Sequence, residues 1–148
     1  MRWSPSVTVA AVIRRQDRYL MVEERPDGQS VINQPAGHLE FGESIIEAVC
    51  REVLEETGRV FEPSGLVGTY QWTVPGSRRS YLRFCFTGDV GEQSVGCAID
   101  PDIVDTHWMS YAEIAQGNLP VRSPLVLRCI DDSGNGAPLP LDLIRTLT

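Results

Sequence analysis

The chain has 148 residues, which suits one domain with a core large enough to be stable without disulfide or metal staples. Its hydrophobic fraction of 42% and charged fraction of 22% are ordinary for a globular protein. The net charge of -7 disfavours a nucleic-acid partner, and no stretch approaches the roughly 20 apolar residues of a membrane span. We therefore expect a single domain over residues 1–148 that binds neither nucleic acid nor membranes.

The four cysteines are widely separated, and no C-x-x-C pair occurs, so a zinc site is not expected. Three of them lie in apolar segments and are interpreted as buried thiols. Together with the lack of a recognisable signal peptide, this favours a reducing cytoplasm.

The N-terminal third predicts strands. Residues 6–14 are apolar and β-branched, as in a strand buried on both faces, and residues 18–24 are expected to form a hairpin with them. A Pro-Asp-Gly loop and a short extended piece over residues 31–35 follow.

A helix is predicted over residues 45–57. Ser44 is the N-cap, Glu47 completes a capping box three positions later, and Gly58 ends the helix. Apolar residues recur at intervals of three and four and predict a face that packs on a sheet: Ile46, Val49, Cys50 and Val53.

Glu52, Glu55 and Glu56 share another side of this helix. Like charges at such spacing cost about 0.2–0.5 kcal/mol per pair, and the last helical turn disfavours anions. Hard cations such as Mg²⁺ or Mn²⁺ bind carboxylate oxygens and offset this cost. The competing interpretation is a solvated acidic face.

Further elements are predicted downstream. A turn over residues 62–65 precedes a hairpin of strands 66–74 and 80–88, a patternless loop leads to Val104, and a short strand covers residues 106–109. Ser110 is expected to cap a helix over residues 111–116, and Ser123, followed by Pro124, to cap a helix within residues 120–131. Residues 139–147 fit either a helix or a strand. Strands on both sides of one long helix indicate an α/β sandwich with a mixed sheet.

The spacing from Gly37 through Glu43, Arg51-Glu52 and Glu55-Glu56 to Gly58 resembles the signature of the Nudix hydrolase family. Only the last position departs, where Arg59 precedes the expected apolar residue. The strings QPAGHLE, QW, LRF, WMS and RSPLV resemble the NudJ-type phosphatases of that family and span most of the chain.

The resemblance implies a Nudix-type α/β/α sandwich that hydrolyses a diphosphate linkage with Mg²⁺, for which Mn²⁺ is a possible substitute. It implies Glu55 and Glu56 as principal metal ligands, with the Ala36 carbonyl beside them. Glu52 is implied as a further ligand or as the base that activates water.

Positioning roles are expected for two residues near these acids. Glu43 is expected to orient Arg51 or a water, and Arg51 could hold a carboxylate in a fixed orientation. Asp102 is the candidate general base from the loop before the last strand, with Asp105 next. Both also suit a solvent-facing loop.

Four residues are candidates for substrate binding. Trp72 could stack on a flat ring or belong to the core, and Arg83 could meet a phosphate or pair with an acid across strands. Gln34 and Glu24 are expected to line the same pocket. His38 and His107 are interpreted as structural.

The resemblance to the NudJ-type phosphatases implies small diphosphates as substrates: nucleoside di- and triphosphates, hydroxymethylpyrimidine diphosphate and thiamine diphosphate. Two alternatives are a Nudix module that senses a nucleotide without cleaving it and an RNA 5′-end pyrophosphohydrolase. The acidic balance of the chain disfavours the second. The sequence leaves open whether the protein is a monomer or a homodimer.

Overall fold

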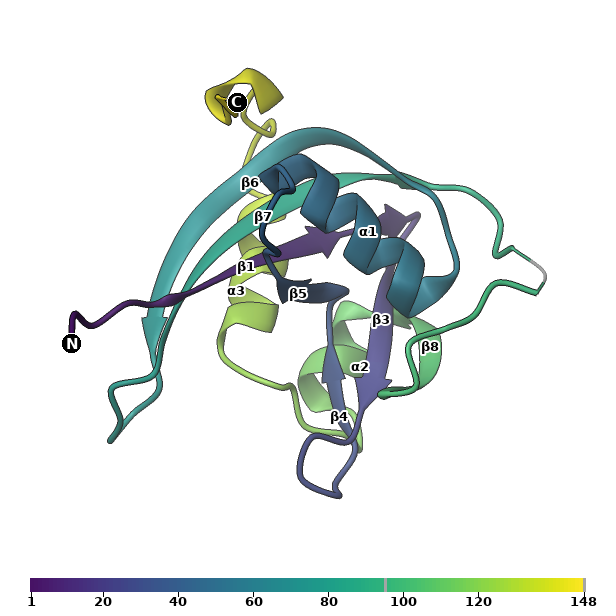
Figure 1. The fold of residues 1–148 in the computed structure, drawn as a ribbon. Helices are drawn as coiled ribbons and strands as arrows, with labels where there is room; N and C mark the ends of the chain where they lie inside the picture. Colours follow the sequence, from purple (N-terminus) through teal and green to yellow (C-terminus); the bar gives the residue numbers. More distant parts are fainter. Residues whose placement is uncertain (95, 148) are drawn as a thin grey trace.

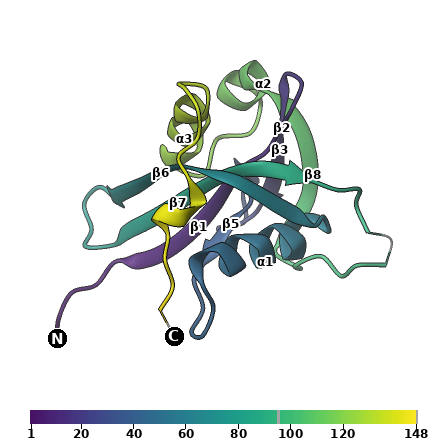
Figure 2. The ribbon, with the colours of Figure 1, turned by 90° about the horizontal axis from the view of Figure 1, so that it is seen from above.

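The computed structural model describes residues 1–94 and 96–147, so Val95, inside the predicted loop, lies outside the described residues. The chain folds into one mixed sheet and one antiparallel sheet, with helices on both sides (Figures 1 and 2). The strands are β1 Ser6–Val12, β2 Arg14–Arg15, β3 Arg18–Glu24, β4 Val31–Asn33, β5 Ala36–His38, β6 Phe61–Thr73, β7 Ser80–Val90 and β8 Ile103–Ser110. The helices are α1 Ile45–Thr57, α2 Tyr111–Gln116, α3 Leu125–Ser133 and the 3-10 turn η1 Leu141–Leu143.

The first sheet has the strand order β5-β1-β7-β6, with β1 parallel to β7 and the other neighbours antiparallel. The second sheet is built on β3, which pairs with β2, β4 and β8. Helix α1 covers one face of the first sheet and α3 the other, as Figure 2 shows. The predicted α/β sandwich with a mixed sheet is therefore confirmed.

Strand β1 forms the centre of the core because both of its faces are buried. Val9, Ala11 and Ile13 pack with Val49 and Val53 of α1. Ala10 and Val12 point to the other face, where they join the cluster that contains Cys129 of α3. The alternation of side chains along one strand thus links the two helical layers.

Helix α1 begins and ends where the sequence predicts. The Ser44 side chain accepts a hydrogen bond from the Glu47 N–H, the Glu47 side chain accepts one from the Ser44 N–H, and Gly58 has a left-handed φ of 71°. Ser110 and Glu113 form the predicted capping box of α2 in the same way. All four cysteines are free, and Cys85 and Cys129 are buried.

Some of the predicted strand pairings and element boundaries were wrong. Strands β1 and β3 do not form one hairpin: the two-residue strand β2, which follows β1, forms the hairpin with β3, and β1 belongs to the other sheet. The predicted turn over residues 62–65 lies inside β6, because a register shift between Pro63 and Gly65 lets the strand continue through it.

Helix α3 starts later than predicted, with Pro124 rather than Ser123 at the N-cap. The Ser123 hydroxyl nevertheless accepts a hydrogen bond from the Leu125 N–H at 3.2 Å. Before the helix, Val121 forms an isolated parallel bridge to Ile32 of β4. In the tail, η1 is the regular element, and Leu139 bridges to Leu66. Among the described residues, no helix is both long and apolar enough to cross a membrane.

Candidate active site

Arg51 connects the acids of α1 to the segment before the helix. Its Nε and Nη2 donate to the two carboxylate oxygens of Glu43 at 2.9 and 2.7 Å. Its Nη1 donates to Glu52 at 2.8 Å and to Glu55 at 3.2 Å, and Nη2 also donates to the His38 carbonyl at 3.0 Å. These hydrogen bonds from Arg51 hold the pKa of Glu43 below its usual value.

Glu56 is a carboxylate buried without a cation. It is 5% exposed, and its Oε1 accepts a hydrogen bond from the Ala36 N–H at 2.9 Å. Burial raises its pKa to about 9, and the nearby charges of Glu24, Glu52 and Asp100 act in the same direction. No ion pair reaches Glu56 from residues 1–94 or 96–147, so no basic side chain in this part of the chain compensates the acid.

Glu52 is the second buried acid, with an exposed fraction of 9%. Burial raises its pKa, against the opposing effect of Arg51. Its carboxylate lies against the backbone of Gly37, where a Cβ atom would overlap it. Glycine at position 37 therefore allows β5 and α1 to approach at this point.

Glu55 differs from these two acids because its side chain is 47% exposed. In the described part of the chain, no three acidic, histidine or cysteine side chains gather closely enough to hold a metal ion. Arg51 Nη1 donates to both Glu52 and Glu55, whereas the Glu56 carboxylate accepts a hydrogen bond from the Ala36 N–H. The donor set still fits a hard cation, since a buried carboxylate surrounded by acids lacks any positive partner.

The loop before β8 brings Asp100, rather than Asp102, to the acids of α1. The Asp100 N–H donates to the Glu55 carbonyl at 2.8 Å, and the Asp100 carboxylate raises the pKa of both Glu52 and Glu56. Asp102 is exposed, and its N–H donates to the Asp100 carboxylate at 2.9 Å. Asp105 is also exposed. Sequence reasoning missed Asp100 because nothing in a patternless loop ranks one aspartate above another.

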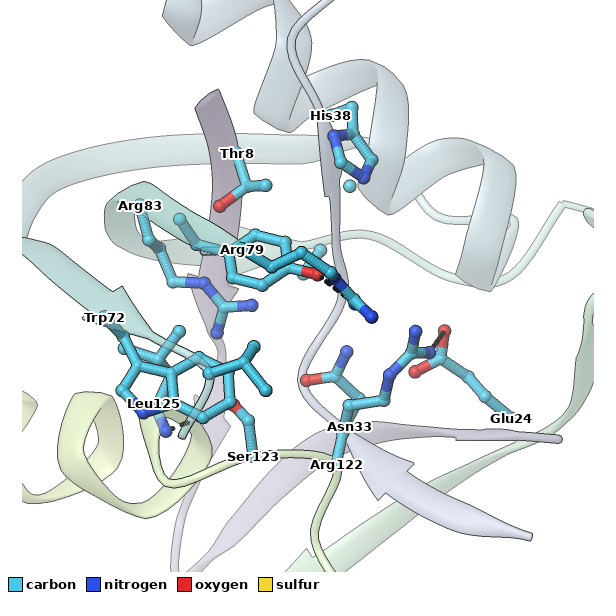
Figure 3. Close-up of a pocket in the computed structure, with 14 residues that line it drawn as sticks. Thr8, Glu24, Asn33, His38, Trp72, Arg79, Arg83, Arg122, Ser123 and Leu125 are labelled. Atoms are coloured by element: carbon cyan, nitrogen blue, oxygen red, sulfur yellow. Dashed lines mark hydrogen bonds and ion pairs between the residues drawn. The ribbon is translucent and has the colours of Figure 1, made fainter. Parts of the chain in front are cut away.

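A cavity of about 350 Å³ opens beside these acids, bordered by Ala36 and Gly37 (Figure 3). Its other lining residues come from β1, β3, β4, β5, β6, β7, the connection between β6 and β7, the segment before α3 and the start of α3: Thr8, Glu24, Asn33, His38, Trp72, Val74, Arg79, Tyr81, Arg83, Arg122, Ser123 and Leu125. Three of the four predicted substrate-binding residues, Glu24, Trp72 and Arg83, are therefore on its wall.

The aromatic part of this wall is half-buried rather than part of the core. Trp72 stacks on Tyr81 with ring centroids 6.0 Å apart and an angle of 17° between the planes. The Tyr81 hydroxyl accepts a hydrogen bond from Arg79 Nη2 at 2.7 Å. The Trp72 ring is thus supported from one side by a fixed neighbour.

Arg83 is 7% exposed, and its cross-strand neighbours are Thr8 on β1 and Tyr70 on β6. Its Nη1 donates to Gln34 Oε1 at 3.2 Å, so its partner is an amide and not the acid considered above. Gln34, 1% exposed, lies behind the cavity wall and not on it, because its amide nitrogen donates to the Ala11 carbonyl. The prediction that Gln34 lines the pocket was wrong.

The sequence reasoning also missed Asn33, Arg79 and Arg122. Arg122 pairs with Glu24, with Nη1 3.2 Å from Glu24 Oε2. The segment that contains Arg122 lies beside β4 because Val121 bridges to Ile32. These two residues are nearly ninety positions apart, so no local pattern reveals the contact. His107 pairs with Glu23 at 3.1 Å, away from the cavity.

The comparisons with known proteins agree with this architecture. Residues 4–129 match the NUDIX domain. Phosphatase NudJ of Escherichia coli (strain K12) is 38% identical over 142 residues, which are 96% of this chain and 92% of that protein. A NUDIX hydrolase from Nitrosomonas europaea superposes with a TM-score of 0.92 at 48% identity, covering 97% of this chain and 98% of the other.

A more distant structure shares the fold alone. The NUDIX domain of Shewanella oneidensis NrtR, in complex with ADP ribose, has a TM-score of 0.70 at 22% identity and covers 89% of this chain and 88% of that chain.

The fold, the acidic helix and the adjoining polar cavity define an enzyme that hydrolyses diphosphate linkages. The chain belongs to the Nudix hydrolase family, and within it is similar to the NudJ phosphatases.

Proposed function

We propose that this protein is a Mg²⁺-dependent hydrolase of the diphosphate linkage in small nucleotide-like molecules, acting as one domain over residues 1–148. The candidate substrates are nucleoside di- and triphosphates, hydroxymethylpyrimidine diphosphate and thiamine diphosphate. The observation that carries the proposal is Glu56: a buried carboxylate with a pKa raised to about 9, near other acids, which accepts a hydrogen bond from Ala36, a residue of the cavity wall.

Glu52, Glu55 and Glu56, with the Ala36 carbonyl, would hold the cation. A bound divalent ion of this kind acidifies water and stabilises charge that develops on phosphate oxygens. The Glu55 side chain accepts a hydrogen bond from Arg51. Because it is half-exposed, it nevertheless has freedom to reorient. Mn²⁺ would occupy the same oxygen ligands.

The protein groups around the acids have separate tasks in this proposal. Arg51 holds the Glu52 carboxylate in orientation, and Glu43 in turn fixes the Arg51 guanidinium through two hydrogen bonds. Asp102 stays a candidate base. Asp100 is added to it, because Asp100 is the loop acid whose charge reaches Glu52 and Glu56.

The cavity would hold the part of the substrate beyond the scissile linkage. Trp72, backed by Tyr81, offers a flat surface to a ring. Arg79 and Arg83 add positive charge that offsets an anionic substrate, while Arg122 is already paired with Glu24. The acids and the cavity meet at Ala36 and Gly37, so the diphosphate would lie there.

The experiment is turnover on the candidate substrates with and without Mg²⁺, resolving released phosphate from diphosphate, with Glu55→Gln in parallel. Mg²⁺-dependent release that Glu55→Gln lowers supports the proposal. Binding of a substrate without any release, with either Mg²⁺ or Mn²⁺, would favour a nucleotide-sensing module instead.

A further inference from the structure

In the described part of the chain, four buried side-chain polar atoms lack a hydrogen-bond partner, and all four belong to residues that line the same cavity. They are Thr8 Oγ1, Glu24 Oε1, Asn33 Oδ1 and Arg83 Nε. Buried polar atoms in folded proteins are nearly always paired, because an unpaired one loses its hydration without compensation. Their location on one cavity points to a ligand that completes the missing hydrogen bonds.

Two of these atoms, Glu24 Oε1 and Arg83 Nε, have fixed hydrogen-bonding roles. An ionised carboxylate only accepts hydrogen bonds, and a guanidinium only donates them, so rotation of the group cannot exchange the two roles. Glu24 is fixed by Arg122 through its other oxygen, and Arg83 is fixed by Gln34 through Nη1. Glu24 Oε1 therefore requires a donor from the ligand, and Arg83 Nε requires an acceptor.

The remaining two atoms extend this pattern. Thr8 and Asn33 are 5% and 6% exposed, and the Thr8 hydroxyl can donate or accept. In Figure 3, Asn33 lies on the side of Glu24 and Arg122, whereas Thr8 lies with Arg83 and Trp72. One side of the cavity thus favours hydrogen-bond donors of the ligand, and the other side receives its acceptors.

A phosphate group does not match this arrangement. All its oxygens are acceptors at neutral pH, so it would leave Glu24 Oε1 unpaired and place two anions against each other. A flat nitrogen heterocycle that carries an amino group does match. Its amino hydrogens can reach Glu24 and Asn33, a ring nitrogen or carbonyl can accept from Arg83, and its face can lie against Trp72.

We propose that Glu24, Asn33 and Arg83 form a specificity site for the amino-substituted edge of a nitrogen heterocycle on the substrate. This proposal rests on the proposed hydrolase function and assigns the cavity's buried end to the ring instead of to a phosphate. A ring with a carbonyl in place of the amino group would turn an acceptor toward the Glu24 carboxylate. The site should therefore discriminate between two substrates with the same diphosphate linkage.

The test compares CTP with UTP, in which the ring amino group is replaced by a carbonyl and the adjacent ring nitrogen changes from an acceptor to an N–H donor, and includes dCTP. We expect kcat/KM for CTP to exceed that for UTP by about tenfold or more. A site discriminates strongly against a substrate that leaves one of its buried hydrogen-bonding groups unpaired. Glu24→Gln, whose amide can either donate or accept, should reduce the CTP/UTP ratio several-fold. Thr8→Val, which keeps the side-chain shape, should lower kcat/KM for both nucleotides together.

The matched control is Glu23→Gln. Glu23 neighbours Glu24 on β3, but its oxygens are paired with Ser30 and His107, outside the cavity. This variant should keep the CTP/UTP ratio of the unmodified protein. Because the readout is a ratio, a general loss of activity in Glu24→Gln does not imitate the expected result.

Equal kcat/KM for CTP and UTP, or a ratio that Glu24→Gln leaves unchanged, would overturn the specificity site while the hydrolase function stands. If Glu24→Gln changes the CTP/dCTP ratio instead, Glu24 binds the sugar and the proposal is also wrong. Absence of Mg²⁺-dependent release from every nucleotide would contradict the hydrolase function itself.

Discussion

The substitution Glu56→Gln should make the metal-free protein more stable while it removes activity. The amide keeps the oxygen that accepts the Ala36 N–H hydrogen bond, but it carries no charge into the buried site. In the folded protein the pKa of Glu56 is raised from 4.5 to about 9, chiefly by burial. Folding therefore favours the protonated form of Glu56.

The sign and size of the effect follow from linkage. The stability that protonated Glu56 contributes is fully present below pH 4.5 and is lost as pH rises toward 9. One pKa unit corresponds to about 1.4 kcal/mol, so the loss in free energy of unfolding at pH 7 reaches about 3 kcal/mol. For a chain of this size, that is a difference in Tm of roughly 6–12 °C.

The assay is thermal unfolding of both proteins in EDTA at pH 5 and pH 8. The Tm advantage of Glu56→Gln should be small at pH 5 and large at pH 8, and adding Mg²⁺ should raise the Tm of the unmodified protein more than that of the variant. The reasoning fails if the two proteins have the same Tm at pH 8 in EDTA, or if their difference does not depend on pH.

Three further substitutions separate the tasks of neighbouring residues. Gly37→Ala places a Cβ against the Glu52 carboxylate, so kcat should fall at least tenfold while Tm changes little; a large loss of Tm with normal kcat would contradict this. Arg51→Lys loses the forked pair with Glu43 and should lower kcat by about 10–100-fold; unchanged kinetics would show that the fork is dispensable. Ser44→Ala removes the N-cap of α1 and should cost about 1 kcal/mol in denaturant unfolding, with kcat/KM retained; a stability unaffected by the change would refute the capping argument.

The sequence predicts α1 accurately because local chemistry sets both of its ends. Ser44 and Glu47 satisfy the first N–H groups of the helix, and Gly58 takes the left-handed conformation at its end. The same chemistry predicts α2. The acids of α1 follow automatically, since their places on the helix surface depend only on their spacing.

The errors in the predicted fold arise where contacts with distant parts of the chain determine the secondary structure or the strand pairing. Polar and small residues at positions 62–65 predict a turn, but pairing with β7 carries β6 through them. The hydrophobic run of β1 is long enough for a hairpin, yet parallel pairing with β7 draws it into another sheet. The local propensity of a segment does not reveal either of these long-range strand pairings.

For the site, too, the residues set by local sequence were predicted, and several of those brought together by long-range contacts were missed. The acids of α1 and their arginine are apparent from one continuous stretch, whereas the cavity combines β1, β3, β4, β5, β6, β7, the connection between β6 and β7, and the chain around the start of α3. Arg122 and Asn33 carry no local signal, and Asp100 is distinguished from Asp102 only by its three-dimensional position. Gln34 was misplaced because a residue next to a predicted site need not face it.

The most direct test of the central claim is the Mg²⁺ dependence of turnover, measured in parallel on the unmodified protein and Glu56→Gln with one nucleoside triphosphate. We expect a rate that rises with Mg²⁺ and saturates for the unmodified protein, and a folded, thermally stable variant whose rate is at least a hundredfold lower. Equal Mg²⁺-dependent rates in the two proteins would contradict the assignment of Glu56 to the metal site.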